Sequence, residues 1–418
     1  MMEQEPDQAI LDQPRLRGDL EFSRNIGGDA NIIIVKDPVS GRFHRFGPVE
    51  DFILHQLDGK TDLDQIRDRT EQQFGAELDR ETLEAFVGSL RGRGLLAAAD
   101  MSKDLSKVEG GWRQKVRSRI RGSLLYLRFN AFDPDQKLER MLGRLGFCFT
   151  RRFVVASIWL ILLALLTLIS NSDEFGRDFA GVFQPGSILP ALAIVLLTTI
   201  GHEFAHGLTC KYYGGQVHEM GFLLLFFQPA LYCNVSDAWL FPEKSKRIWV
   251  GMAGTYFELV LWAVAVFVWR ITAPETALNF IALVLLGTSG MRIFLNLNPL
   301  IKLDGYYVLS DWLEIPNLRA RAFAFIRLWL RRPWSTSRIN LPVREKRIYL
   351  WYGLFAMTFT VWILTYITSA IAGFLTGALQ GTGFVIFVGL LAIVFHKPII
   401  GLWRRMLGDR PQTRGVRT

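Results

Sequence analysis

Hydrophobic and polar residues are arranged differently in two regions of the chain. Between residues 20 and 100, apolar residues alternate at short intervals with charged ones, whereas between 150 and 402 they form long runs. Each run approaches the roughly 20 residues that a helix needs to cross the hydrocarbon core of a membrane. The pattern predicts a mainly α, polytopic membrane protein of about six transmembrane helices, at 153–170, 188–209, 249–269, 277–297, 348–370 and 380–400.

The first region predicts a small α+β, winged-helix-like domain over residues 20–100. The β-branched stretch from Asn31 to Lys36, a turn at Ser40-Gly41 and the stretch from Arg42 to Phe46 together predict a β-hairpin. A final short strand is expected from Leu95 to Ala98. Between them, the spacing of apolar residues predicts three helices, which start at Pro48, at Thr61 or Asp62, and near Asp79.

Two segments fit neither pattern. Residues 101–150 are basic and predict a connector to the transmembrane domain, which we place at 151–402. The apolar run from Met220 to Phe227 is too short to cross a membrane. We expect it to form strands or a re-entrant segment that leans into the membrane part, where protein or water satisfies its backbone groups.

The net charge of +9 is explained by membrane topology rather than by nucleic-acid binding. Arg and Lys cluster beside the apolar runs, where they orient spans and meet membrane lipids, whereas the segment from Asn171 to Ser187 is acidic. The positive-inside rule therefore predicts that both termini are cytoplasmic. The three cysteines form no C-x-x-C pair, so neither a disulfide framework nor a cysteine metal site is expected.

His202, Glu203 and His206 form an H-E-F-A-H motif inside the second apolar run. Residues four apart share one face of a helix at a distance of about 6 Å, so both imidazoles can bind one metal ion. Glu203 then leans toward a water beside that ion. Ionisable side chains are costly in a membrane span, which argues against an accidental motif.

A catalytic zinc site with two histidines needs a third protein ligand and one open position. Asp304 follows the fourth span and lies near its cytoplasmic end, the depth predicted for His202 and His206 in theirs. Asp304 has the alternative role of capping the segment that follows. Asn296 and Asn298 either contact the substrate or pair with backbone groups freed beside the neighbouring proline.

The two motifs resemble the site-2 protease family of intramembrane zinc metalloproteases, in particular a bacterial branch of peptide zinc metalloproteases. His202, Glu203 and His206 stand at H-E-x-x-H, while Asn296 and Asp304 fit N-x-x-P-x-x-x-x-D-G. The resemblance implies that both histidines and Asp304 bind Zn²⁺, and that Glu203 is the catalytic base. It also implies that Asn296 holds the substrate backbone or the oxyanion. A bacterial inner membrane and a periplasmic adaptor protein of an export system are the implied location and partner.

The chain departs from that family pattern at two places. The family commonly has asparagine in a Gly-x-x-x-Asn element of the next span, whereas Glu258 follows Gly254 here. We expect Glu258 to pair within the helix bundle, with Arg292 as the candidate partner. The loop from Thr272 to Thr276 is also too short for the PDZ domain that many relatives insert.

The small α+β domain resembles the winged-helix subunit of pyrroloquinoline quinone biosynthesis, whose relatives recognise leader peptides. The matching features are Gly47-Pro48, the stretch from Leu57 to Thr61, Ile66 and the end from Gly94 to Leu96. The resemblance implies a peptide-recognition domain in which an extended peptide pairs with the strand from Asn31 to Lys36. The alternative is a cytosolic cap that only stabilises the membrane part.

These features predict an intramembrane zinc endopeptidase that cleaves a membrane-associated or ribosomally made peptide near the cytoplasmic face. The alternative is a non-proteolytic membrane subunit of a peptide export or immunity system. An intact base, Glu203, beside the histidines favours the enzyme. His218 and Asp237 are either active-site neighbours or an ordinary surface histidine and a cap.

Overall fold

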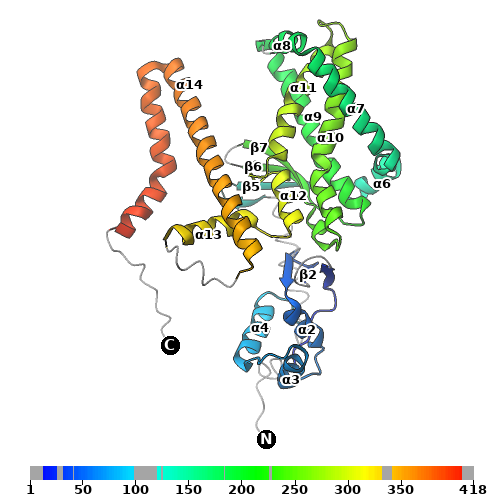
Figure 1. Ribbon diagram of the computed structural model, residues 1–418, viewed down its shortest axis with the longest axis vertical. Coiled ribbons are helices and arrows are strands. Elements are labelled where there is room, and N and C mark those ends of the chain that lie inside the picture. Colours follow the sequence, from blue (N-terminus) through cyan, green and yellow to red (C-terminus); the bar gives the residue numbers. More distant parts are fainter. Residues whose placement is uncertain are drawn as a thin grey trace. The chain divides into compact units, whose positions relative to one another are not determined.

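The computed structural model describes residues 13–25, 32–40, 42–97, 120–123, 126–182, 184–225, 228–331 and 341–406 (Figure 1). The chain folds as two units, Met1–Pro316 and Asn317–Thr418. The first unit holds an N-terminal sheet with its helices, a central sheet and four of the candidate membrane spans.

The N-terminal region is a three-stranded antiparallel sheet that shares one apolar core with three helices. The elements are β1 (Glu21–Asn25), β2 (Ile32–Asp37), β3 (Arg42–Phe46), α2 (Pro48–Gln56), α3 (Leu63–Phe74) and α4 (Arg80–Gly92). Ile33 and Val35 of the sheet meet Ile66 and Leu90 of the helices in that core. The hairpin and the three helices confirm the prediction from the sequence.

Local chemistry explains where these helices begin and end. Pro48 has the backbone angle that suits a first helical turn, and the Glu50 side chain accepts a hydrogen bond from the Gly47 N–H at 2.6 Å. Helix α3 ends at Gly75, whose φ of 66° lies in the left-handed region that glycine adopts without strain.

Two features of the N-terminal sheet differ from the expectation. The strand predicted from Leu95 is reduced to one bridge, between Leu16 and Leu96, and Ala98 lies outside the described residues. An unpredicted strand, β1, pairs with β2 on the side opposite β3. Because β2 is the central strand, its backbone hydrogen-bonding groups are used within the sheet. The predicted addition of a peptide to this strand is therefore wrong.

Five helical segments of the described chain are long and apolar enough to cross a membrane. They are α7 (Arg151–Ser170), α9 (Ile188–Tyr212), α10 (Lys244–Ile271), α11 (Ala277–Leu297) and the Val343–Gly377 part of α14 (Val343–Met406). Trp159, Leu166 and Ile169 are exposed along α7, as expected of a lipid-facing surface. The protein is therefore a multi-pass membrane protein. The sixth predicted span, 380–400, lies where side chains are outside the described residues.

A central antiparallel sheet has the strand order β4-β5-β6-β7. Figure 1 labels its strands β5, β6 and β7. Its strands are β4 (Ile120–Ser123), β5 (Tyr126–Phe132), β6 (Met220–Leu225) and β7 (Gln228–Cys233). The apolar run after the second span thus forms strands, which was one of its two predicted structures. Strands β4 and β5, with α6 (Asp135–Leu145), come from the basic segment predicted as a connector. Leu127 and Phe129 alternate there with Arg128 and Asn130, a period-two signal for a strand.

Gly221 allows β5 and β6 to approach each other closely. A β-carbon at this position would overlap the carbonyl oxygen of Phe129 and lie 2.8 Å from the backbone nitrogen of Ala131. The strand register shifts at the same place, between Asn130 and Phe132. A glycine therefore interrupts the apolar run where the sheet has a bulge.

Shorter helices complete the two units. In the first unit, α8 (Ser172–Ala180) follows α7, and α12 (Asp304–Leu313) follows α11. In the second unit, α13 (Leu318–Arg331) packs on α14, where the rings of Phe325 and Tyr349 are 6.1 Å apart. Gly353 makes this contact close, because a β-carbon there would lie 2.6 Å from Cδ1 of Ile326.

Candidate metal centre

The two histidines of the H-E-F-A-H motif lie on one face of α9 and are buried. The Nε2 atoms of His202 and His206 are 3.1 Å apart. Asp304, at the start of α12, places its Oδ2 atom 3.1 Å from Nε2 of His202 and 3.4 Å from Nε2 of His206. The structure therefore brings the three predicted ligand residues together as a candidate metal site, which we call the His-His-Asp cluster.

A turn after α11 carries Asp304 to the histidines. The helix ends where Asn298 adopts an extended backbone before Pro299, and the Asn298 side chain accepts a hydrogen bond from the Leu300 N–H at 2.9 Å. Gly305 lets α12 return close to α11, because a β-carbon there would lie 2.5 Å from the last carbonyl oxygen of α11. Of the two roles predicted for Asn298, contact with the substrate or pairing with backbone groups beside the proline, the structure shows the second.

Each imidazole of the cluster is held at its Nδ1 atom by a group that can only accept a hydrogen bond. Nδ1 of His202 lies 3.1 Å from Oε1 of Glu258, and Nδ1 of His206 lies 2.7 Å from the carbonyl oxygen of Val250. In neutral rings both protons are therefore on Nδ1, and both Nε2 lone pairs face each other and Asp304. A cation is what stabilises three electron-rich atoms that converge in a buried site.

The separations of the three ligand atoms fit a small divalent ion such as Zn²⁺. Two atoms that are each about 2.0–2.1 Å from a tetrahedral zinc ion lie roughly 3.3 Å apart. The three separations in the cluster run from 3.1 to 3.4 Å. Two imidazoles and one carboxylate are also a ligand set of catalytic zinc sites, which keep a fourth position open.

The backbone of α10 closes one side of the cluster at Gly254. A β-carbon at this position would overlap Nε2 of His202 and lie 2.5 Å from Nε2 of His206. The next residue, Thr255, donates a hydrogen bond from its hydroxyl to Oδ2 of Asp304 at 3.4 Å. Because α10 approaches the ligand atoms so closely, glycine is needed at position 254, the glycine of the Gly-x-x-x-Asn-like element.

Glu203, the predicted base, is half-buried on the turn of α9 that carries His202. Its carboxylate lies close to the backbone N–H of Cys233, at the end of β7. Gly207, one turn further along α9, lets the Cys233 side chain lie close to this helix, since a β-carbon there would lie 3.1 Å from Sγ of Cys233. Glu203 is therefore a neighbour of both the cluster and the central sheet. Asn296 lies half-buried in the last turn of α11, and its contact with a substrate stays a prediction.

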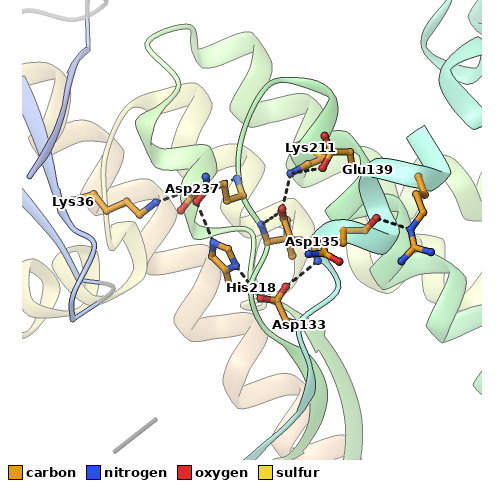
Figure 2. A network of polar contacts seen from close by, with 11 residues as sticks. Lys36, Asp133, Asp135, Glu139, Lys211, His218 and Asp237 are labelled. Carbon is orange, nitrogen blue, oxygen red and sulfur yellow. Dashed lines mark hydrogen bonds and ion pairs between the residues drawn. The ribbon is translucent and has the colours of Figure 1, made fainter. Parts of the chain in front are cut away.

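His218 and Asp237 belong to a different group of side chains, which we call the outer network (Figure 2). Its other labelled members are Lys36, Asp133, Asp135, Glu139 and Lys211. The His218 side chain is 58% exposed, and its Nδ1 lies 3.1 Å from Oδ2 of Asp133. Asp237 accepts hydrogen bonds from Nζ of Lys36 at 3.0 Å and from the backbone N–H of Gln216 at 3.1 Å. Both residues have their partners in the outer network. Neither belongs to the His-His-Asp cluster, the group of potential metal ligands found in the described chain.

Comparison of the chain with protein-family models, with curated proteins and with solved structures finds no match. The fold and the site define a multi-pass membrane protein with a buried His-His-Asp cluster that is suited to a metal ion.

Proposed function

We propose that this protein is an intramembrane zinc endopeptidase. The observation that carries the proposal is the convergence of two imidazoles and a carboxylate beside Glu203 on an apolar helix. His202, His206 and Asp304 are three protein ligands, the number typical of catalytic rather than structural zinc sites. The resemblance of the two motifs to the site-2 protease family supports the same assignment.

Each residue around the cluster has its own role in the proposed hydrolysis. Zn²⁺ held here would supply a Lewis acid that makes water more acidic and polarises a carbonyl group. Glu203 accepts the proton of the attacking water and returns it to the leaving amine. The backbone N–H of Cys233 is close to the Glu203 carboxylate. Asn296 is assigned to the substrate backbone or the oxyanion.

The substrate has to be extended at the site, because a helix hides its peptide bonds within its own hydrogen bonding. Strand β7 is an outer strand of the central sheet in the described chain, and its end at Cys233 is close to Glu203. An extended segment of a membrane-associated or ribosomally made peptide that pairs with β7 comes alongside the base.

Substrate selection is assigned to the N-terminal sheet, at a strand other than β2. Strand β1 lies against η3 (Ser236–Leu240), where the Ser23 hydroxyl donates a hydrogen bond to the Leu240 carbonyl oxygen. Strand β3 is the other outer strand of the described sheet, and we assign it to the peptide. The ion pair between Lys36 and Asp237 then connects the recognition sheet with the membrane part.

The proposed orientation has both termini in the cytoplasm of a bacterium, with the protein in its inner membrane. We also propose a periplasmic adaptor protein of an export system as a partner of this protein. In a variant without the native cysteines, Ser172→Cys should react with an impermeant reagent in intact cells, and Lys244→Cys should not. The reverse labelling pattern would contradict this orientation.

The rival proposal is a non-proteolytic membrane subunit with a structural metal ion. A structural zinc site is normally closed by four protein ligands and needs no neighbouring base. The described chain brings three ligand residues together, and Glu203 lies beside them. These two observations favour the enzyme.

The decisive experiment compares Glu203→Gln with the unmodified protein in detergent. The amide cannot accept a proton, so cleavage of fluorescein-labelled casein should fall by at least about 100-fold while the zinc content stays near one ion per chain. Glu139→Gln is the matched control, because that side chain is 70% exposed on α6, and it should cleave normally. Normal turnover by Glu203→Gln would contradict the proposed mechanism.

A further inference from the structure

Glu258 places a carboxylate in the interior of a candidate membrane span. Its side chain is 0% exposed on α10. An isolated ionised carboxylate is very costly in such a place, so Glu258 needs a compensating partner. Its Oε1 atom lies 2.6 Å from Nη2 of Arg292 on α11 and 3.1 Å from Nδ1 of His202 on α9. Oε1 of Glu258 thus contacts both the Arg292 guanidinium and the His202 imidazole of the candidate metal site.

Arg292 is held on its other side by α9. Its Nη1 atom donates a hydrogen bond to Oγ1 of Thr199 at 2.9 Å, and the Thr199 hydroxyl donates to the carbonyl oxygen of Val195 at 2.7 Å. Thr199 lies one turn before His202 on the same helix. The guanidinium is therefore fixed between α9 and α10, and its position fixes that of Glu258.

One face of α10 contacts both histidines of the cluster. Val250, Gly254 and Glu258 are spaced four residues apart, so they lie along a single side of the helix. The Val250 carbonyl oxygen orients His206, Gly254 makes room for both rings, and Glu258 orients His202. The two imidazoles differ in one respect. His206 donates to a neutral carbonyl group, whereas His202 donates to a charged carboxylate, which is the stronger acceptor.

The pair also balances the charge of the site. Asp304 and Glu203 together neutralise a divalent ion, so a further carboxylate alone would leave an excess negative charge in the membrane interior. Arg292 cancels the charge of Glu258. The chain can therefore place a carboxylate behind His202 without changing the net charge around the ion.

We propose that Glu258, held by Arg292, is a positioning residue for the metal ligand His202. The carboxylate keeps the proton of His202 on Nδ1, fixes the plane of the ring and makes Nε2 a stronger metal ligand. This inference rests on the metal site of the proposed function, but not on proteolysis. It gives a role to the residue that stands where the resembling family commonly has asparagine.

The test measures zinc affinity by competition with a chelator, on the full-length protein in detergent. Glu258→Gln keeps the shape of the side chain but removes its charge, and should weaken zinc binding by about 10–100-fold. Asp178→Asn is the matched control, because Asp178 accepts a hydrogen bond from Nε1 of Trp269 at 2.9 Å between two helices away from the cluster. This control should bind zinc as the unmodified protein does.

Three further variants separate positioning from general damage to the bundle. Arg292→Gln should also weaken zinc binding, and Arg292→Lys should restore part of it. In Glu258→Gln/Arg292→Gln no unpaired charge is left, so the combined loss should be smaller than the product of the two single losses. If Glu258→Gln does not fold, this double variant carries the affinity measurement in its place.

The absorption spectrum of bound Co²⁺ gives a readout that a purely structural role of Glu258 would leave unchanged. We expect the visible bands to shift in Glu258→Gln and not in Asp178→Asn. A folded Glu258→Gln with unchanged zinc affinity and an unchanged cobalt spectrum would overturn the inference while leaving the metal site intact. Absence of zinc binding by the unmodified protein would instead overturn the metal site, and this inference with it.

Discussion

The His-His-Asp cluster and the outer network contain similar residues but match their hydrogen-bonding groups in opposite ways. In the cluster, the Nε2 atoms of two histidines face each other and the Asp304 carboxylate at 3.1–3.4 Å. In the outer network, Lys211 donates to Asp135 at 2.6 Å, and His218 lies beside Asp133 (Figure 2). In the His-His-Asp cluster, hydrogen-bond acceptors converge on one another when the rings are neutral. In the outer network, hydrogen-bond donors face acceptors. The direction of the lone pairs, rather than the residue types, therefore distinguishes a candidate metal site from a structural network.

Removal of a ligand should produce the largest difference between the two regions. His206→Ala deletes one of three protein ligands, and zinc affinity should fall by more than about 100-fold, a loss greater than that of a supporting residue. The measurement is the zinc content after dialysis against a weak chelator. Full zinc occupancy in His206→Ala would show that the cluster is not the metal site.

Gly254→Ala should impair the metal site without removing a ligand. The added methyl group would overlap Nε2 of His202 and crowd Nε2 of His206, so α10 or the imidazoles must move. We expect zinc affinity to fall by about 10–100-fold, as for other residues that support metal ligands. Gly290→Ala is the control, because a β-carbon there would meet Trp262 at an ordinary 3.5 Å. Equal zinc affinity in both variants would contradict the close approach of α10.

Lys211→Met should affect stability and leave zinc affinity unchanged. Lys211 and Asp135 are largely buried at 15% and 17% exposure, and loss of their contact should cost about 1–2 kcal/mol. Thermal unfolding in detergent measures this loss. Zinc affinity equal to that of the unmodified protein would separate the outer network from the cluster, and a weakened affinity would join them.

The cost of Lys211→Met should depend on pH in a defined direction. Burial by itself raises the pKa of Asp135, but the hydrogen bonds from Lys211 and the Val217 N–H outweigh it and hold this pKa below its ordinary value. A lowered pKa in the folded state stabilises the fold above the unfolded pKa of about 3.9. That stabilisation is lost as pH falls through the folded pKa. The stability difference between the two proteins should therefore shrink below about pH 4, and a constant difference would exclude this ion pair as its source.

His218→Ala should have the smallest effect. The side chain is 58% exposed, so its contact with Asp133 contributes little, and the change in stability should stay within about 0.5 kcal/mol. Zinc content should not change. A loss of zinc in this variant would place His218 in the metal site and remove the contrast between the two regions.

Local patterns in the sequence were sufficient for much of the fold and for the three residues of the candidate metal site. Runs of apolar residues predicted the helices that can cross a membrane, because length and composition decide this property. The spacing of His202 and His206 placed both rings on one helix face, since the α-helix repeats every 3.6 residues. Asp304 was predicted from the matching depth of the cytoplasmic ends of the second and fourth spans, and the structure brings it to the histidines.

The pairing of distant segments was decided only by the tertiary structure. Strand β1 occupies the edge of β2 that was predicted to receive a peptide, and β5 pairs with a strand about 90 residues further along the chain. Period-two alternation can show that a segment is a strand, but it does not name its partner or its place in the sheet. Lys36 and Asp237 are likewise joined across 201 positions of sequence.

The surroundings of the two histidines also depended on tertiary packing. The sequence predicts that Glu258 pairs with Arg292, but the charges alone do not show that Glu258 stands behind His202. Nor did the sequence show that Gly254 lies against both rings, or that the Val250 carbonyl oxygen holds His206. Helix periodicity determines which residues share a face. Which face meets which neighbour depends on how the packed helices fit together, and here that fit turns three acceptors toward one point.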